Sequence, residues 1–214
     1  MPALKKLLER LDYQCVQGNP DIEISHLIYD SRKAGKDDLF VCIKGTAVDG
    51  HKFVGEVAQK GAAAIVVQED VEAPEGVTVI KVEDTRYALA LLSAAYFDHP
   101  AEKMRVIGVT GTKGKTTTTY MVKSILENAG YKVGLIGTIE AIIGNKIIPA
   151  SNTTPESYVV QEYFHEMVEA GCDCVVMEVS SQGLMLHRTQ GFVFDFGIFT
   201  NIEPDHIGPN EHKD

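Results

Sequence analysis

Apolar and polar positions in the first hundred residues follow helical and strand patterns in turn. Leucines at positions 4, 7, 8 and 11 share one face of an amphipathic helix, which predicts a helix over residues 3–12. Apolar runs between polar and glycine residues predict strands over 22–29, 39–43, 63–67 and 77–82. Helical spacing predicts two more helices, over 53–61 and over 84–97, with Asp84 capping the second. Together these elements form a small α/β unit.

The second part of the chain repeats the order strand, loop, helix, strand. Strands are predicted over 104–110, 132–137, 173–179 and 192–200, and helices over 155–170 and before Gly130. Gly144-Asn145 between isoleucine pairs predicts a hairpin. This order favours a mostly parallel sheet. The segment 98–103 contains a proline and charges, as a linker would, so we predict two domains, residues 1–98 and 99–214.

Composition narrows the class of protein. The 214 residues are 44% hydrophobic and 23% charged, as in ordinary soluble α/β proteins. A net charge of −10 disfavours nucleic acid and acidic membranes as partners. Neither a run of about 18 apolar residues nor a signal peptide is visible. Four cysteines are too few and too scattered for a disulfide framework. The close pair Cys172 and Cys174 predicts buried thiols in a reducing compartment, so a cytoplasmic location is expected.

The strongest chemical signal is Gly111-Thr112-Lys113-Gly114-Lys115-Thr116, placed between an apolar strand and a helix. Backbone amides of such a loop converge on phosphate oxygens, the lysine reaches the terminal phosphates, and the threonine hydroxyl can bind Mg²⁺. The match to the full Walker pattern is imperfect, because Val109 stands where a glycine is expected. The alternative is a glycine turn that holds a lysine by chance. The loop predicts how an acidic protein holds an anion.

Phosphoryl transfer also needs an acidic metal ligand beside the phosphate loop. Glu178 lies within the apolar run 173–179, where an unpaired carboxylate costs several kcal/mol. A metal ion or another cation must therefore compensate it. The alternative is a buried ion pair of purely structural value.

Further motifs lie on both sides of the predicted linker. The second half carries, in this order, the phosphate loop, Asn152-Thr153-Thr154-Pro155, Met177-Glu178-Val179-Ser180-Ser181, His187-Arg188, Thr200-Asn201 and Asp205-His206. The first half carries Asp30-Ser31-Arg32, Gly35, Phe40, Lys44-Gly45 and Asp49-Gly50. Taken together, these motifs resemble those of the Mur ligase family, nearest its MurE branch, which makes the UDP-N-acetylmuramoyl tripeptide, and the first-half motifs are similar to the family's UDP-binding domain. The resemblance implies a small α/β UDP-binding domain followed by an incomplete central P-loop domain with a parallel sheet.

The resemblance also implies roles for individual residues. ATP phosphates would be held by Thr112, Lys113, Gly114, Lys115, Thr116 and Thr117. Magnesium ligands would be Thr116, Glu178 and His206, and the catalytic groups Lys115, Glu178 and His206. The muramoyl substrate would contact Ser31, Thr46, Asn152, Thr153, Thr154, Ser180 and Arg188, the last by gripping an anionic group. The sequence departs from the family's usual residues at Lys113, Gln182, Leu186 and the loop after His206.

The implied reaction is ATP-dependent amide formation. A carboxylate of UDP-N-acetylmuramoyl-L-Ala-D-Glu takes the γ-phosphoryl group, and the amine of an amino acid then displaces phosphate from the acyl phosphate. The amino acid itself is not specified by these residues. Three alternatives stay open: a folylpolyglutamate synthetase-like ligase, a P-loop kinase or NTPase, and a non-catalytic module that binds a UDP-sugar.

The resemblance covers only the first half of such an enzyme. From this we expect that the 214 residues alone do not turn over. The last predicted strand, 192–200, has no return element after it, so we also expect an exposed sheet edge and self-association through it.

Overall fold

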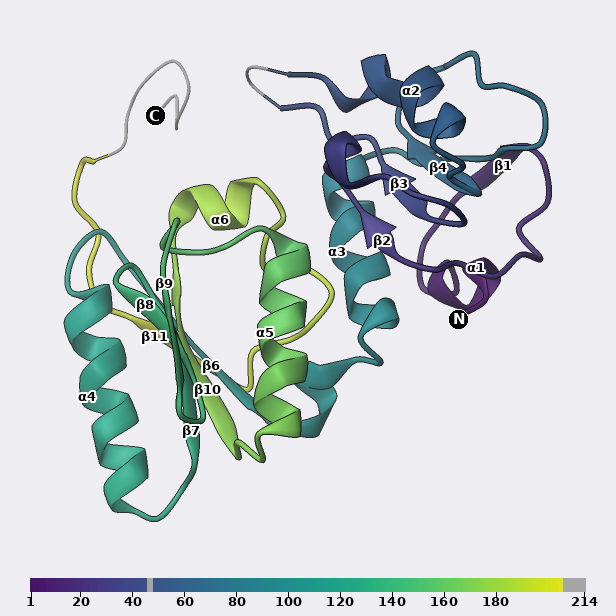
Figure 1. Cartoon of the computed structure of the whole chain (residues 1–214). Coiled ribbons are helices and arrows are strands. Elements are labelled where there is room, and N and C mark those ends of the chain that lie inside the picture. Colours follow the sequence, from purple (N-terminus) through teal and green to yellow (C-terminus); the bar gives the residue numbers. More distant parts are fainter. Residues whose placement is uncertain (46–47, 206–214) are drawn as a thin grey trace. The chain divides into compact units, whose positions relative to one another are not determined.

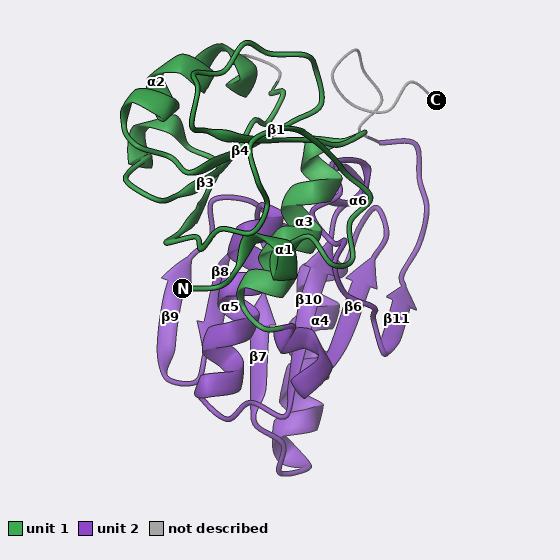
Figure 2. Cartoon of the chain, turned by 90° about the vertical axis from the view of Figure 1, so that its right-hand side faces the viewer, with its two compact units in different colours: residues 1–98 green, residues 99–214 purple. Residues whose placement is uncertain are grey.

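The computed structural model describes residues 1–45 and 48–205 and divides into two compact units, Met1–Asp98 and His99–Asp214 (Figure 2). Each unit has its own sheet with helices, and most strands in both sheets are parallel. The predicted α/β class is therefore confirmed. Within the described residues, none of the helices has both the length and the apolar character needed to cross a membrane.

The first unit contains a sheet of five strands in the order β1-β5-β4-β3-β2. Strands β2 to β5 are parallel, and β1 pairs antiparallel with β5. The strands are β1 (Gln14–Gln17), β2 (Leu27–Ile28), β3 (Leu39–Val41), β4 (Ala64–Val67) and β5 (Thr78–Lys81). The helices are α1 (Leu4–Leu7), α2 (Val54–Gln59) and α3 (Thr85–Tyr96), with two 3₁₀ turns, η1 (Ser31–Lys33) and η2 (Gly50–Phe53). Asp84 caps α3 as predicted, because its carboxylate accepts two of the helix's first amides.

Two elements of the first unit are shorter than predicted, and one strand was not predicted. The helix expected over 3–12 is limited to α1, although Leu8 and Leu11 remain buried in the turns that follow it. The strand expected over 22–29 is reduced to β2. Strand β1 has alternating exposed and half-buried residues and so lacks the apolar run that would reveal it. Its pairing with β5 holds it at the sheet edge.

The second unit contains a sheet of six strands in the order β11-β6-β10-β7-β8-β9 (Figure 2). Strands β11, β6, β10 and β7 are parallel, and β8 and β9 form the predicted hairpin at Gly144, whose φ is 57°. The strands are β6 (Arg105–Thr110), β7 (Val133–Ile136), β8 (Glu140–Ile143), β9 (Lys146–Pro149), β10 (Cys174–Val179) and β11 (Phe196–Phe199). The helices are α4 (Lys115–Asn128), α5 (Ser157–Glu169) and α6 (Ser181–Met185), with a 3₁₀ turn η3 (Pro100–Lys103).

Helices α4 and α5 cover opposite faces of this sheet (Figure 1). Helix α4 packs Val122 and Leu126 on one face, against a cluster that includes Val109 and Val176. Helix α5 packs Phe164 and its neighbours on the other face, against residues such as Val175 and Met177. This sandwich of sheet and helices fixes the carboxyl ends of β6, β7 and β10 relative to one another.

Strand β11 pairs with β6 and forms one edge of the sheet. Its Phe196 and Phe199 are 54% and 63% exposed. Self-association through this edge stays a prediction, which sedimentation velocity of the 214-residue chain would test. Cys172 and Cys174 are buried thiols, as the sequence predicts.

Candidate functional site

The carboxyl ends of β6 and β10 bring the predicted phosphate loop and the predicted acidic residue together. The loop 111–114 leaves β6 and leads directly into α4. Glu178 lies in β10, in register with Val109 of β6. Ligands of open α/β sheets bind at this end of the parallel strands. The topology therefore places the loop beside a buried carboxylate.

The loop adopts a backbone shape that glycine favours. Gly111 has φ 136° and Gly114, the N-cap of α4, has φ 83°. A Cβ at Gly111 would lie 2.1 Å from the hydroxyl oxygen of Thr200. The close approach of the segment after β11 therefore requires glycine at position 111.

The segment 200–203 holds the loop through backbone and side-chain hydrogen bonds. The Asn201 carbonyl accepts from the amide of Thr112 (3.1 Å), and the Asn201 side-chain oxygen accepts from the amide of Lys113 (3.0 Å). The hydroxyl of Thr200 donates to the Lys113 carbonyl at 2.8 Å. The amides of Thr112 and Lys113 are therefore engaged within the protein. The first turn of α4, whose amides lack partners within the helix, is left to face a phosphate.

Two of the predicted ATP-binding side chains point toward this segment. The ammonium of Lys113 pairs with Glu203, and the hydroxyl of Thr112 accepts from the amide of Glu203 at 2.9 Å. The charge that Lys113 adds to the loop is thus balanced by a neighbouring carboxylate. Lys115, by contrast, lines a pocket, and the hydroxyl of Thr116 donates to Glu178 of β10.

Replacing Asn201 with alanine is expected to weaken Mg²⁺-ATP binding about tenfold. The substitution removes the acceptor for the Lys113 amide and the donor to the Lys113 carbonyl, each worth about 1 kcal/mol, so the loop loses its fixed shape. Calorimetric titration measures the change. Asn128→Ala is the matched control, because Asn128 ends α4 and donates only to the carbonyl of Ser124 on the same helix. Unchanged affinity in Asn201→Ala would contradict this role.

The ammonium of Lys115 is held at the mouth of the loop. It donates to the carbonyls of Gly111 (2.7 Å) and Thr112 (3.1 Å) and remains half-buried. These carbonyls fix the lysine where a phosphate on the loop would meet it. A short movement exchanges two neutral acceptors for an anionic one, which is a stronger hydrogen bond.

Glu178 is 1% exposed, and neutral donors surround its carboxylate. The hydroxyl of Thr116 donates to its Oε2 at 3.0 Å. The amide of Thr138 donates to Oε1 (2.9 Å) and the Thr138 hydroxyl to Oε2 (3.1 Å). A Cβ at Gly137 would lie 2.6 Å from Oε1, so a larger residue there would displace the carboxylate. Hydroxyls and an amide, rather than a protein cation, satisfy the buried charge in the described part of the chain.

Thr116 and Glu178 together form a pair of hard oxygen donors. Their oxygens lie 3.0 Å apart beside the phosphate loop. Mg²⁺ prefers one or two protein oxygens and takes its remaining ligands from phosphates and water, so this donor set fits magnesium. In the described residues no cluster of three or more His, Cys, Asp or Glu side chains is present. His206, the third predicted ligand, lies outside the described residues.

Another acidic group lies close to this centre. Tyr120 of α4 donates to Glu140 at 2.8 Å. Burial, together with this hydrogen bond, raises the pKa of Tyr120 to about 12. The phenol therefore remains a donor at neutral pH and holds Glu140 in place.

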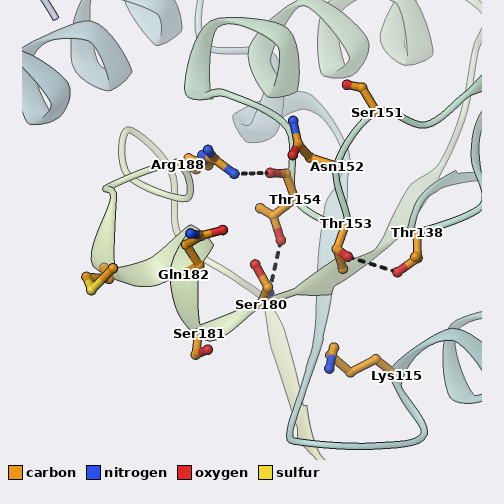
Figure 3. Close-up of a pocket in the computed structure, with 11 residues that line it drawn as sticks. Lys115, Thr138, Ser151, Asn152, Thr153, Thr154, Ser180, Ser181, Gln182 and Arg188 are labelled. Atoms are coloured by element: carbon orange, nitrogen blue, oxygen red, sulfur yellow. Dashed lines mark hydrogen bonds between the residues drawn. The ribbon is translucent and has the colours of Figure 1, made fainter. Parts of the chain in front are cut away.

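A pocket of about 350 Å³ opens beside Lys115 within the second unit (Figure 3). It is polar, with Lys115 and Arg188 as its two cationic side chains. Its lining residues are Lys115, Thr138, Ser151, Asn152, Thr153, Thr154, Ser180, Ser181, Gln182, Met185 and Arg188. Five of the predicted substrate-binding residues thus line one cavity, together with the predicted phosphate-binding lysine.

Thr154 has a buried side chain, so its hydroxyl serves the protein rather than a ligand. It donates to the carbonyl of Glu178 (3.0 Å) and accepts from the amide of Ser180 (2.9 Å). Arg188 donates to the Thr154 carbonyl at 3.0 Å, and Figure 3 shows the two meeting. Ser180 in turn caps α6 by accepting from Gly183. Thr154 therefore positions the loop, and Asn152 and Thr153 are left to face the pocket.

The remaining predicted substrate-binding residues, Ser31 and Thr46, belong to the first unit. Ser31 begins η1, and its carbonyl accepts from the ammonium of Lys60 at 2.8 Å. The Arg32 guanidinium, bonded to Asp30, lowers the pKa of that carboxyl to about 2. This ion pair orders the Asp30-Ser31-Arg32 turn. Thr46 lies outside the described residues.

The sequence interpretation missed Thr138, Ser151, Ser181 and Met185 as pocket residues. Thr138 follows β7 directly, so its place at the carboxyl end of a parallel strand was the signal that could have found it. Ser151 precedes a predicted motif, and Ser181 and Met185 belong to α6, which no periodicity predicts because it is only five residues long.

Comparisons with known proteins agree with this architecture. Residues 109–214 match the family model "Mur ligase middle domain", and residues 23–97 match "Mur ligase family, catalytic domain". The UDP-N-acetylmuramoyl-L-alanyl-D-glutamate--2,6-diaminopimelate ligase of Clostridium perfringens is 52% identical over 204 residues, which are 95% of this chain and 42% of that protein. The corresponding ligase of Clostridioides difficile is 47% identical over 99% of this chain and 43% of its own length.

A solved structure of a UDP-N-acetylmuramoyl-L-alanyl-D-glutamate--2,6-diaminopimelate ligase superimposes with a TM-score of 0.81 at 18% identity, covering 99% of this chain and 42% of that one. The MurF ligase of Thermotoga maritima in complex with ADP gives a TM-score of 0.55 at 24% identity over 85% of this chain and 38% of its own. At these identities the structural likeness shows the fold alone. The chain spans less than half the length of these relatives.

Proposed function

The chain belongs to the Mur ligase family. From that premise we propose that these residues belong to a MurE-type ligase, which uses ATP to join an amino acid to UDP-N-acetylmuramoyl-L-Ala-D-Glu. The observation that carries the proposal is one cavity lined by both Lys115 of the phosphate loop and Arg188, with Thr116 and Glu178 hydrogen-bonded beside it. The names of the similar ligases support 2,6-diaminopimelate as the amino acid.

The reaction needs positioning and charge neutralisation more than a protein nucleophile. An oxygen of the substrate carboxylate bonds to the γ-phosphorus while the bond from that phosphorus to the bridging oxygen breaks and ADP leaves. The amine then bonds to the acyl carbon, phosphate leaves with the electron pair of the cleaved C–O bond, and the amine loses a proton. Lys115 holds the transferred phosphoryl oxygens, and Arg188 orients an anionic group of the muramoyl peptide.

Thr116 and Glu178 would hold a magnesium ion at this site, and their oxygen donors suit it. When bound, Mg²⁺ supplies charge neutralisation of the phosphate oxygens. The protein presents the Thr116 hydroxyl and the Glu178 carboxylate near the carboxyl ends of the parallel strands. The hydrogen bonds from Thr138 hold the Glu178 carboxylate in its orientation.

The alternatives are weaker on specific grounds. A folylpolyglutamate synthetase-like ligase or a plain P-loop kinase leaves the first unit without a role, although residues 23–97 match a Mur ligase family model. A non-catalytic UDP-sugar module leaves unexplained the phosphate loop and buried carboxylate of the second unit.

Calorimetric titration of the chain with UDP-N-acetylmuramoyl-L-Ala-D-Glu and, separately, with Mg²⁺-ATP tests the proposal. We expect saturable binding of both ligands, and no binding of a folate in place of the muramoyl ligand. ATP binding without muramoyl binding would favour another ligase or a kinase. Failure of both ligands to bind would remove support for a ligase site in these residues.

A further inference from the structure

Thr138 connects the two halves of the candidate site. It lies between β7 and β8, and its hydroxyl is 3.1 Å from Oε2 of Glu178 and 3.0 Å from the hydroxyl of Thr153. Figure 3 shows the hydrogen bond between Thr138 and Thr153 as a dashed line. Glu178 belongs to the proposed nucleotide and metal side, and Thr153 belongs to the loop that lines the substrate side. The Mur ligase motifs in this sequence give Thr138 no role.

The available protons fix the direction of this chain of hydroxyls. A carboxylate only accepts hydrogen bonds, and a threonine hydroxyl has one proton to donate. The Thr138 proton therefore points to Glu178, and the Thr153 proton points to the lone pair of Thr138. The chain runs from Thr153 through Thr138 to Glu178.

Thr138 provides two of the three hydrogen bonds that Glu178 receives through its carboxylate. The third donor, Thr116, can bind a metal ion through a lone pair of its hydroxyl oxygen and still donate its proton to Glu178. With or without the metal, most of the hydrogen bonds that orient the carboxylate therefore come from Thr138. Because Thr153 donates to the same hydroxyl, a ligand that moves Thr153 changes how strongly Thr138 donates to Glu178.

We propose that Thr138 is a positioning residue that orients Glu178 and couples occupancy of the muramoyl pocket to the affinity for Mg²⁺-ATP. This role rests on the proposed function. Thr138 is exposed and lies outside the strands, so a substitution there does not disturb a buried core. A substitution also keeps the backbone amide that donates to Glu178 and removes only the side-chain hydroxyl. A variant can therefore separate the positioning role of the hydroxyl from a purely structural role.

Thr138→Val tests the hydroxyl, since valine keeps the shape and the amide. We expect Mg²⁺-ATP affinity to fall about tenfold or more, as for other residues that orient a metal ligand. Thr138→Ser should restore most of it, because serine keeps the hydroxyl. Thr118→Val on α4, where Thr118 is half-buried, is the matched control and should bind as the unmodified chain does. Thermal unfolding of each variant checks that the fold is intact.

The coupling has its own readout. The ratio of the Mg²⁺-ATP dissociation constants with and without saturating UDP-N-acetylmuramoyl-L-Ala-D-Glu should differ from one in the unmodified chain and approach one in both Thr138→Val and Thr153→Val.

Two outcomes overturn the role of Thr138 alone: normal Mg²⁺-ATP affinity and coupling in Thr138→Val, or a serine variant as weak as the valine variant, which would mean that the hydroxyl by itself does not support binding. Failure of the unmodified chain to bind Mg²⁺-ATP would overturn the proposed function as well, so the two failures are distinguishable.

Discussion

Replacing Lys115 with alanine is expected to weaken ATP binding about 100-fold, a larger loss of affinity than the one expected for Asn201→Ala. The ammonium lies at the mouth of the loop, tied to the carbonyls of Gly111 and Thr112, and it lines the pocket. A hydrogen bond between charged groups contributes about 1.5–3 kcal/mol, and about 1.4 kcal/mol corresponds to a factor of ten in affinity. The overall charge of −10 adds to this dependence, since the protein's average field repels ATP.

Calorimetric titration with Mg²⁺-ATP measures this loss. Lys123→Ala is the control, because Lys123 lies on the same helix and pairs with Glu127 one turn away. It removes an equal charge from α4 without touching the loop, so its affinity should change by no more than a few-fold. If both lysine variants lose affinity equally, general charge and not the loop lysine holds the phosphates. If Lys115→Ala binds ATP normally, the phosphate-loop assignment is wrong.

The parts of the fold that follow from local signals could be predicted. The run Val106 to Val109 reads as a buried strand because its residues are apolar on both faces, which parallel strands covered by two helix layers require. The hairpin at Gly144 could also be predicted from local residues, because a two-residue turn needs positive φ and glycine adopts it readily. The loop from Gly111 to Gly114 carried its chemistry in its own residues.

The contacts that tune the site could not be predicted, because they join residues about ninety positions apart. Asn201 holds the amides of Thr112 and Lys113 only because β11 pairs beside β6, and strand order is a property of the whole sheet. The ion pair between Lys113 and Glu203 likewise forms only because β11 lies beside β6.

Motif membership also failed to separate ligand contacts from supports. Thr154 belongs to a motif expected to contact the substrate. Its side chain is buried, however, and its hydroxyl donates to the backbone carbonyl of Glu178 and accepts from the backbone amide of Ser180. Thr138 belongs to none of the motifs, yet it gives Glu178 two hydrogen bonds. Thr138 and Thr154 differ in role from what the motifs predict because of the directions in which their side chains point. Both residues lie in loops, where spacing along the sequence does not determine the direction of a side chain.

Glu178→Gln is expected to reduce the dependence of ATP binding on magnesium about 100-fold. Glutamine has nearly the same shape and keeps one oxygen to accept from Thr116 or Thr138, but it brings no negative charge and turns an amino group toward donors that need an acceptor. Leaving such groups unpaired costs about 1–3 kcal/mol, so the variant should also unfold at lower urea concentration.

The binding experiment separates these two effects. ATP is titrated in EDTA and again in saturating Mg²⁺, and the ratio of the two dissociation constants is compared between chains. We expect about a 100-fold smaller magnesium effect in Glu178→Gln, because losing a carboxylate ligand removes a charge-assisted contact of about 1.5–3 kcal/mol. Affinity in EDTA should hold or rise, because a negative charge beside the phosphates has gone; a merely unfolded variant would lose binding in both buffers. Glu127→Gln, on the exposed end of α4, keeps the magnesium effect if the assignment is right. Retention of that effect in Glu178→Gln would mean that the metal is held by other groups, and the pairing of Glu178 with Thr116 would then be only structural.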